Sequence, residues 1–216
     1  NEFYPLKSEE NKEKIAERLN LKNNRPLILT VRRLEERMGL ENLILAVEIL
    51  AKKYPEKEFQ LIIVGKGKLK KRLEKMISEK KLSDIVILTG LVPSESLPLY
   101  FRIADLFVLP TIAIEGFGLV TVESFASGLP VMGTPIGATK ELLKLIDPLL
   151  LFQETSPEAL EKGLAHYLLN PEKYINLKTK CRETAEKHFS WEGVTDQIEK
   201  LFTKIVSNQN LNSGKG

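Results

Sequence analysis

The feature that most constrains this chain is a regular alternation between short apolar runs and longer amphipathic segments. Apolar runs of strand length occupy residues 26–31, 59–65, 85–88, 105–109, 130–132 and 149–152. The runs are nearly continuous in their hydrophobicity, which is typical of strands buried on both faces of a parallel sheet. The order predicts an α/β fold, a doubly wound, Rossmann-like parallel sheet of about six strands with helices on both faces.

Helices are predicted between and after these strands from the spacing of apolar residues and from capping signals. The predicted helices span residues 9–19, 39–53, 69–81, 94–104, 119–127, 156–169, 171–188 and 190–206, with Ser94 expected to cap the fourth. In a doubly wound sheet, ligands bind outside the carboxyl ends of the strands. The loops after the first five apolar runs, which follow Val31, Val64, Leu88, Leu109 and Met132, are therefore the places to search for a site.

Composition excludes several classes of protein. With 43% hydrophobic residues over 216 positions, the chain is not wholly disordered, and no apolar run approaches the roughly 20 residues that span a bilayer. The net charge of +3 is too small to indicate nucleic acid as a partner. The single cysteine, Cys181, excludes an internal disulfide framework and suits a reducing compartment, and no zinc-ligand spacing is present.

Three arginines, Arg32, Arg33 and Arg37, follow the first predicted strand directly before a helix. Guanidinium groups and a helix N-terminus both favour phosphate, although a solvated loop paired with neighbouring glutamates is the alternative. After the second strand, Gly65 and Gly67 allow the backbone to approach a ligand or to turn tightly. The third glycine of the dinucleotide fingerprint is absent, so this turn alone is a weak signal.

The loop after the fourth strand is the most informative segment. Gly116 and Gly118 open a helix at the carboxyl edge of the sheet, where free N–H groups can bind an anion, and Glu115 directly precedes them. Glu123 lies eight positions later on an otherwise apolar helix. A carboxylate there is costly without partners, which the hydroxyls of a ribose would supply. The alternative is that Glu123 faces solvent or caps a neighbouring turn.

Together these motifs resemble the C-terminal, nucleotide-sugar-binding domain of the glycogen-synthase-like (group 1, family 4) retaining glycosyltransferases, which have the GT-B fold. The resemblance runs from about Leu27 to Phe202. It is carried by the arginine-rich loop ending at Gly39, the two glutamates at 115 and 123, and the motifs at 64–67, 89–92, 104–110, 127–131, 137–141 and 189–191.

The resemblance implies that the enzyme transfers a hexose to an acceptor from a nucleotide diphosphate sugar, whose nucleotide is UDP or GDP. Glu123 would bind the ribose hydroxyls, and Glu115 would contact the donor sugar. The remaining donor-binding residues would act through their backbone: Leu91 and Val92 toward the base, and Gly116, Phe117, Gly118, Leu119 and Val120 toward sugar hydroxyls and phosphate, with Gly65 and Gly67 beside them.

Arg33 matches the family arginine that neutralises the diphosphate. The usual partner lysine is replaced here by Met38, so Arg37 is expected to act in its place, and the catalytic set is Arg33, Arg37 and Glu115. Fixed cations stabilise the charge that develops on the leaving diphosphate. Two of them make a metal ion dispensable, and no Asp-x-Asp pair lies near the expected site, so neither a metal nor a cofactor is expected.

The family's first domain, which binds the acceptor, would need roughly 150 to 200 residues before Asn1. The chain is therefore interpreted as half an enzyme that binds donor without turnover. Residues 1–24 are expected to form an interdomain linker and N-terminal helix, 25–206 the nucleotide-sugar-binding domain, and 207–216 a flexible tail. The last helices resemble those that return toward the missing domain, and some of their apolar surface is expected to be exposed or used in self-association.

Two alternatives remain open. One is a non-catalytic nucleotide-sugar-binding or regulatory module, in which Met38 marks a lost pair of cations. The other is a domain of a sugar-nucleotide epimerase with a similar two-domain architecture. The basic helix at 69–81 permits peripheral contact with the inner face of a membrane, in addition to the expected cytoplasmic location.

Overall fold

The computed structural model describes residues 2–213, with side chains except at position 197 and at 206–213. Five strands form one fully parallel sheet in the order β3-β2-β1-β4-β5. The strands are β1 (Leu27–Val31), β2 (Gln60–Val64), β3 (Val86–Gly90), β4 (Leu106–Leu109) and β5 (Val131–Gly133). The predicted fold class is confirmed.

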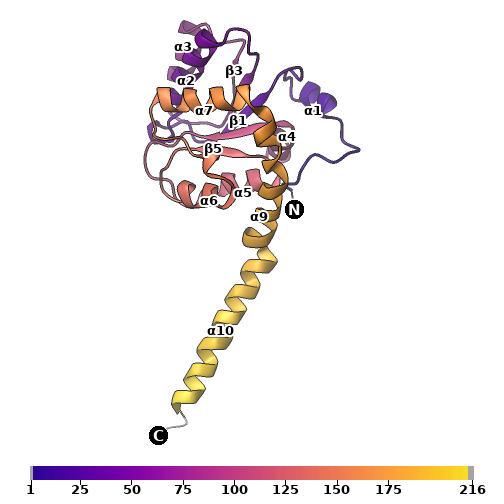
Figure 1. Ribbon diagram of the computed structural model, residues 1–216, viewed down its shortest axis with the longest axis vertical. Coiled ribbons are helices and arrows are strands. Elements are labelled where there is room, and N and C mark those ends of the chain that lie inside the picture. Colours follow the sequence, from indigo (N-terminus) through magenta and orange to yellow (C-terminus); the bar gives the residue numbers. More distant parts are fainter. Residues whose placement is uncertain (1, 214–216) are drawn as a thin grey trace.

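Helices pack on both faces of the sheet. The helices of the described residues are α1 (Lys12–Arg18), α2 (Leu40–Lys53), α3 (Lys70–Glu79), α4 (Leu97–Ile103), α5 (Leu119–Ala126), α6 (Thr139–Ile146), α7 (Pro157–Leu169), α8 (Pro171–Ile175), α9 (Leu177–Phe189) and α10 (Trp191–Ser213), with short 3-10 turns η1 (Glu36–Met38) and η2 (Pro148–Leu150). Helix α2 packs on α3 and α7, and α9 packs on α5 and α6. Figure 1 shows these two groups above and below the sheet.

The sequence pattern explains this arrangement. Every residue of β2, β4 and β5 is buried, because helices cover both faces of these strands. β3 lies at the edge of the sheet and is mostly half-buried. Helix α6 occupies the interval between the fifth and sixth apolar runs, where the alternation implies a helix without defining its bounds.

The sixth predicted strand does not form as expected. Residues 148–150 form η2, and Leu151 makes only a single bridge to Gly133 of β5. Pro148 has no N–H to offer a neighbouring strand, and the carboxylate of Asp147 accepts the N–H of Leu149 at 2.8 Å. These local bonds replace strand pairing, so the sheet has five strands.

Two helix predictions also differ from the structure. Ser94 does not cap α4, which begins at Leu97 after Ser96, and the Ser96 side chain makes no capping bond. The helix predicted at 171–188 is divided at Asn176 into α8 and α9.

Helix α10 projects away from the body of the molecule as a single long rod (Figure 1). It continues to Ser213, beyond the predicted end at Val206, so part of the expected tail is helical, while 214–216 lies outside the described residues. Its exposed apolar side chains are Trp191, Val194, Ile198, Leu201, Phe202 and Ile205. Across the described residues, no helix combines the length and the apolar character needed to cross a bilayer.

Candidate functional site

The site lies at the point where the order of strand addition reverses, between β1 and β4. The chain builds outward from β1 to β2 and β3, then returns to place β4 on the other side of β1. In doubly wound sheets, such a switch point separates two neighbouring loops at the carboxyl edge and leaves a crevice for ligand. Here those loops are 32–39 after β1 and 110–118 after β4.

The two loops are joined by an ion pair between Arg32 and Glu115. Nη2 of Arg32 lies 2.6 Å from Oε2 of Glu115, and their side chains are only 5% and 11% exposed. The hydroxyl of Thr111 donates to the same Oε2 at 2.8 Å. Burial opposes ionisation of Glu115, but the hydrogen bond and charge of Arg32, the Thr111 hydroxyl and the charge of Arg37 together hold the pKa of Glu115 below its usual value.

The guanidinium group of Arg32 has a further contact, with a sulfur atom. Its Nη2 also lies 2.9 Å from the sulfur of Met38, which is buried in the core. Nη1 is buried and has no hydrogen-bond partner within the described residues. Burial lowers the pKa of Arg32, and Glu115 offsets part of that effect.

Arg37 contacts the backbone of the same loop. Its Nη1 donates to the carbonyl of Ile114 at 2.7 Å, and its own carbonyl accepts the N–H groups of Ile112 and Ala113 at 3.0 and 3.4 Å. Ile114 has φ of 55°, in the left-handed region that a β-branched residue rarely adopts. The guanidinium group of Arg37 is thus bound to the residue that precedes Glu115. This hydrogen bond stabilises the left-handed conformation of Ile114.

A hollow of about 320 Å³ lies at the carboxyl ends of the first three strands. It is lined by Val31, Arg32, Arg33, Val64, Gly65, Lys66, Leu91, Val92 and Leu97. Four of the predicted donor-site residues, which come from three different loops, therefore line the same hollow. They are Arg33, Gly65, Leu91 and Val92. Arg33 is exposed, so its charge is available to a ligand.

The glycines after β2 have a packing role that exists without any ligand. A Cβ at Gly65 would lie 1.8 Å from the carbonyl oxygen of Arg32, and one at Gly67 would lie 2.4 Å from that of Leu34. The N–H of Leu34 donates to the carbonyl of Lys66 at 3.0 Å. Gly65 and Gly67 therefore allow the loops after β1 and β2 to lie in direct contact, and only Gly65 also lines the hollow.

The segment from Gly116 to Val120 presents backbone amides at the start of α5. Gly118 caps this helix with φ of 74°, and no side chain bonds to its first turn. Among the hydrogen bonds of the described residues, none is donated by the N–H groups of 116–120. Phe117 is half exposed and packs edge-on against Phe189 of α9, with ring centroids 5.9 Å apart.

Glu123 lies on the second turn of α5. It is partly buried, and its carboxylate has no hydrogen-bond or ion-pair partner among the described residues. Burial raises the pKa of Glu123. The carboxylate is thus unpaired, as expected for a group whose partner is a ligand, although it does not line the hollow that contains Arg33.

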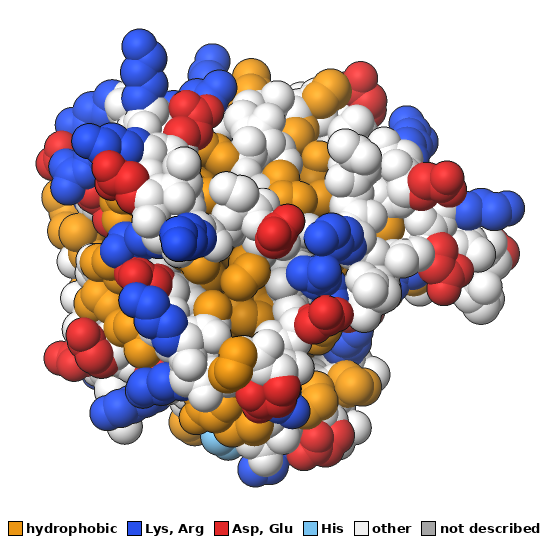
Figure 2. Space-filling model, turned by 90° about the horizontal axis from the view of Figure 1, so that it is seen from above, with side chains coloured by type: hydrophobic (Ala, Val, Ile, Leu, Met, Phe, Trp, Pro, Cys, Tyr) orange, Lys and Arg blue, Asp and Glu red, His pale blue; other side chains and the backbone are white. Residues whose placement is uncertain are grey.

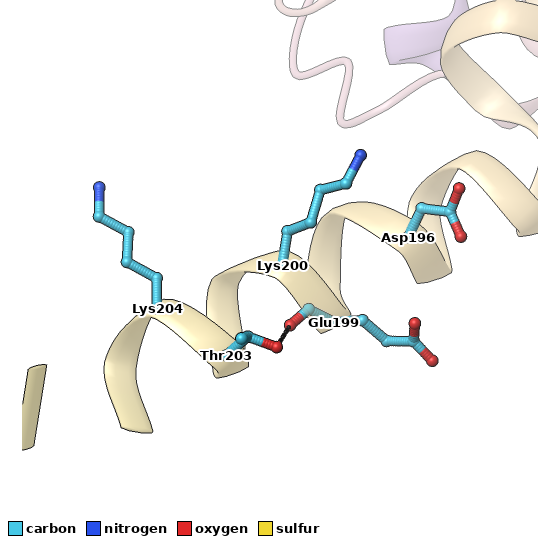
Figure 3. A pocket seen from close by; sticks show the side chains of 5 residues that line it. All are labelled: Asp196, Glu199, Lys200, Thr203 and Lys204. Carbon is cyan, nitrogen blue, oxygen red and sulfur yellow. Dashed lines mark hydrogen bonds between the residues drawn. The ribbon is translucent and has the colours of Figure 1, made fainter. Parts of the chain in front are cut away.

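A recess on α10 is not a comparable site. It measures about 550 Å³ but is bounded only by side chains of α10, and Figure 3 shows them along a single helix. They are Asp196, Glu199, Lys200, Thr203 and Lys204. Within residues 2–213, no group of three or more histidine, cysteine, aspartate or glutamate side chains could hold a metal ion.

Three residues of the site have roles that the sequence did not assign. Arg32 was grouped with Arg33 and Arg37 but, unlike them, received no role; Thr111 carried no signal, and Gly137 was only part of a motif. A Cβ at Gly137, where φ is 56°, would lie 2.1 Å from the carbonyl oxygen of Glu115. One signal for Arg32 was present: a charged residue directly after a buried strand needs a buried partner.

Comparison with known proteins identifies the family of the chain. The model of the family "Glycosyl transferases group 1" matches residues 11–188. A GDP-mannose-dependent alpha-(1-6)-phosphatidylinositol monomannoside mannosyltransferase of Mycolicibacterium smegmatis is 27% identical over 184 residues, covering 82% of this chain and 47% of the relative. The chain spans about half the length of the curated relatives it matches.

Solved structures show the same fold. Sucrose-phosphate synthase from Thermosynechococcus elongatus matches with a TM-score of 0.77 and 27% identity, over 96% of this chain and 50% of that one. HepE of Anabaena, in complex with UDP and glucose, matches with a TM-score of 0.78 and 20% identity, over 93% of this chain and 54% of that one. The sheet and its helices correspond to one half of these GT-B structures.

Proposed function

Starting from the fact that this chain belongs to the group 1 glycosyltransferase family, we propose that it is the donor-binding domain of a retaining hexosyltransferase. The donor is a nucleotide diphosphate sugar, and a second domain of the enzyme binds the acceptor. The observation that carries the proposal is the hollow in which Arg33, Gly65, Leu91 and Val92 converge from three loops. A ligand at this edge would meet apolar side chains and one exposed guanidinium group.

The proposed contacts follow the chemistry of each group. The base lies against Leu91 and Val92, and the diphosphate lies near Arg33 and the unbonded amides of 116–120. The ribose hydroxyls pair with the otherwise unpartnered Glu123, and the sugar meets Glu115. As the glycosidic bond breaks, negative charge grows on the diphosphate, and fixed donors stabilise it without a metal ion.

The location and further contacts of the chain belong to the same proposal. We place it in the cytoplasm, with the exposed apolar side chains of α10 packed against the acceptor domain. Figure 2 shows Lys and Arg side chains gathered toward one side of the upper face, with Asp and Glu among them. On α3 these charges pair along the helix, as in Lys70 with Glu74, so peripheral contact with an anionic membrane would be weak.

Binding measurements on the 216-residue chain test the proposal. A relative uses GDP-mannose and a structural neighbour holds UDP, so the panel contains UDP, GDP and ADP with their glucose and mannose derivatives. A bound ligand at 100 times its dissociation constant should stabilise the fold by about 2.7 kcal/mol, seen as a thermal shift. Equal affinities in EDTA and in magnesium are expected. A folded sample that responds to no nucleotide contradicts the proposal.

Arg33→Met is the diagnostic variant. We expect it to weaken binding of the nucleoside diphosphate by about tenfold while leaving the affinity for the nucleoside itself unchanged, because it removes only a phosphate contact. Arg72→Met, which removes an exposed arginine paired with Glu41, is the matched control. The retaining stereochemistry requires analysis of the product anomer made by an enzyme that contains both domains.

A non-catalytic nucleotide-sugar-binding module is the second candidate. It is favoured by Met38, which is buried in the core at the position where the family has a lysine. A two-domain parent that binds donor but never transfers the sugar would support this candidate over the enzyme.

A further inference from the structure

We propose that Arg32 is a positioning residue that fixes the Glu115 carboxylate so that one of its oxygens faces the donor sugar. The inference deepens the proposed function and rests on it, because the sugar is the group that Glu115 is proposed to contact. The guanidinium group of Arg32 contacts Glu115 and Met38, so its proposed effect on the donor acts through Glu115.

The two oxygens of Glu115 are used unequally. Oε2 accepts both internal hydrogen bonds, from Arg32 at 2.6 Å and from Thr111 at 2.8 Å. Oε1 accepts none within the described residues, and it is not among the buried polar atoms that lack a partner. The carboxylate is therefore held by one oxygen while the other remains free to accept a hydroxyl.

The buried charge of Arg32 makes this arrangement rigid. A guanidinium group that is 5% exposed beside the sulfur of Met38 has no competing solvent, so its interaction with Glu115 is strong. Nη1 remains buried without an acceptor, which leaves Glu115 as the sole anionic partner of Arg32 in the described part of the chain. Removal of either charge would leave the other uncompensated.

The backbone that carries Glu115 is fixed from two further sides. Arg37 bonds the carbonyl of Ile114, whose left-handed conformation persists only because its surroundings impose it. Gly137 packs against the carbonyl of Glu115 at a distance that no side chain permits. A carboxylate held at both its oxygen and its backbone is pre-organised for a ligand.

The first experiment titrates Glu115 directly by carbon-13 NMR of the glutamate side chains, with Glu115 assigned from the Glu115→Gln spectrum. The groups that act on this carboxyl are Arg32, Arg37 and the Thr111 hydroxyl. We expect a pKa below the ordinary glutamate value in the wild type, a higher pKa in Arg32→Met, and rescue toward the wild type in Arg32→Lys. The control Arg72→Met should leave the titration unchanged.

The second experiment separates positioning from simple stabilisation. Affinities are measured for UDP-glucose against UDP and for GDP-mannose against GDP. Arg32→Met should weaken the sugar nucleotide about tenfold more than the nucleoside diphosphate, and Arg32→Lys should restore most of the difference. A merely structural role would weaken both ligands equally, which would overturn the inference.

If Arg32→Met does not fold, Arg32→Gln carries the comparison, since it removes the positive charge beside Oε2 but keeps a polar side chain. A Glu115 titration that stays at the wild-type pKa in the folded, uncharged variant would overturn the role of Arg32 even where ligand binds. A responsive titration without binding of any nucleotide would instead reject the proposed function, and with it the donor contact of Glu115.

Discussion

Arg32 and Glu115 lie 83 positions apart in the sequence, yet their side chains meet at 2.6 Å across the switch point of the sheet. The contact joins the first residue after β1 to the loop after β4, and it does so inside the protein. The loop that carries the proposed sugar contact is thus anchored to the loop beside the proposed diphosphate site.

The first prediction concerns the stability of Glu115→Gln. Because the pKa of Glu115 is lowered on folding, its ionised form stabilises the protein above the unfolded pKa of about 4.3, and this contribution is lost as the pH falls through the folded pKa. We expect the variant to lose about 1–3 kcal/mol at pH 7, because Arg32 keeps only a neutral acceptor. Urea unfolding between pH 3 and 7 measures this. A difference that stays constant down to pH 3 would contradict it.

The second prediction concerns Glu123→Gln. Burial raises the pKa of Glu123, so the charged form destabilises the folded chain above that raised pKa, and the penalty disappears below the unfolded pKa. The variant should therefore unfold at a higher urea concentration than the wild type at pH 7 and at the same concentration near pH 3.

Glu123→Gln should also bind ribonucleotides less tightly than the wild type. We expect about tenfold weaker affinity for UDP or GDP, but no change for the corresponding 2′,3′-dideoxynucleotides, which lack the hydroxyls proposed to pair with Glu123. Equal losses for both kinds of ligand would argue that Glu123 has only a structural role.

The third prediction compares three glycine-to-alanine substitutions. Gly137→Ala combines a left-handed φ with a Cβ only 2.1 Å from the carbonyl oxygen of Glu115, and it should destabilise the fold by about 3 kcal/mol. In Gly90→Ala the backbone is in the left-handed region but the new Cβ meets no neighbouring atom, so the fold should lose about 1 kcal/mol of stability. Gly116→Ala has neither and should change stability by less than about 0.5 kcal/mol. Denaturation midpoints that do not follow this order would refute the assignment.

The fourth prediction concerns the single cysteine. Cys181 is fully buried, and burial raises the pKa of its thiol to about 12. The folded chain should not react with a thiol reagent at pH 8, whereas the chain unfolded in urea should react completely. Rapid labelling of the native protein would show that α9 is not packed as described.

Much of the fold could be read from local pattern. Continuous apolar runs predicted buried parallel strands, and the amphipathic segments predicted most helices close to their observed bounds, except the helix at 171–188, which is divided, and the last helix, which is longer. The prediction of a strand at 149–152 was wrong because Pro148 and Asp147 favour a local turn. Apolar composition alone does not show that a turn competes with strand pairing at these residues.

The sequence by itself determined which loops lie at the carboxyl edge, since a parallel buried sheet places every βα loop there. It also singled out Glu115 and Glu123 as carboxylates in unusual positions. Only the tertiary structure decided which of three nearby arginines reaches Glu115. That choice depends on β1 lying beside β4 and on the direction in which each side chain leaves the loop, and neither is encoded in the spacing of residues along one segment.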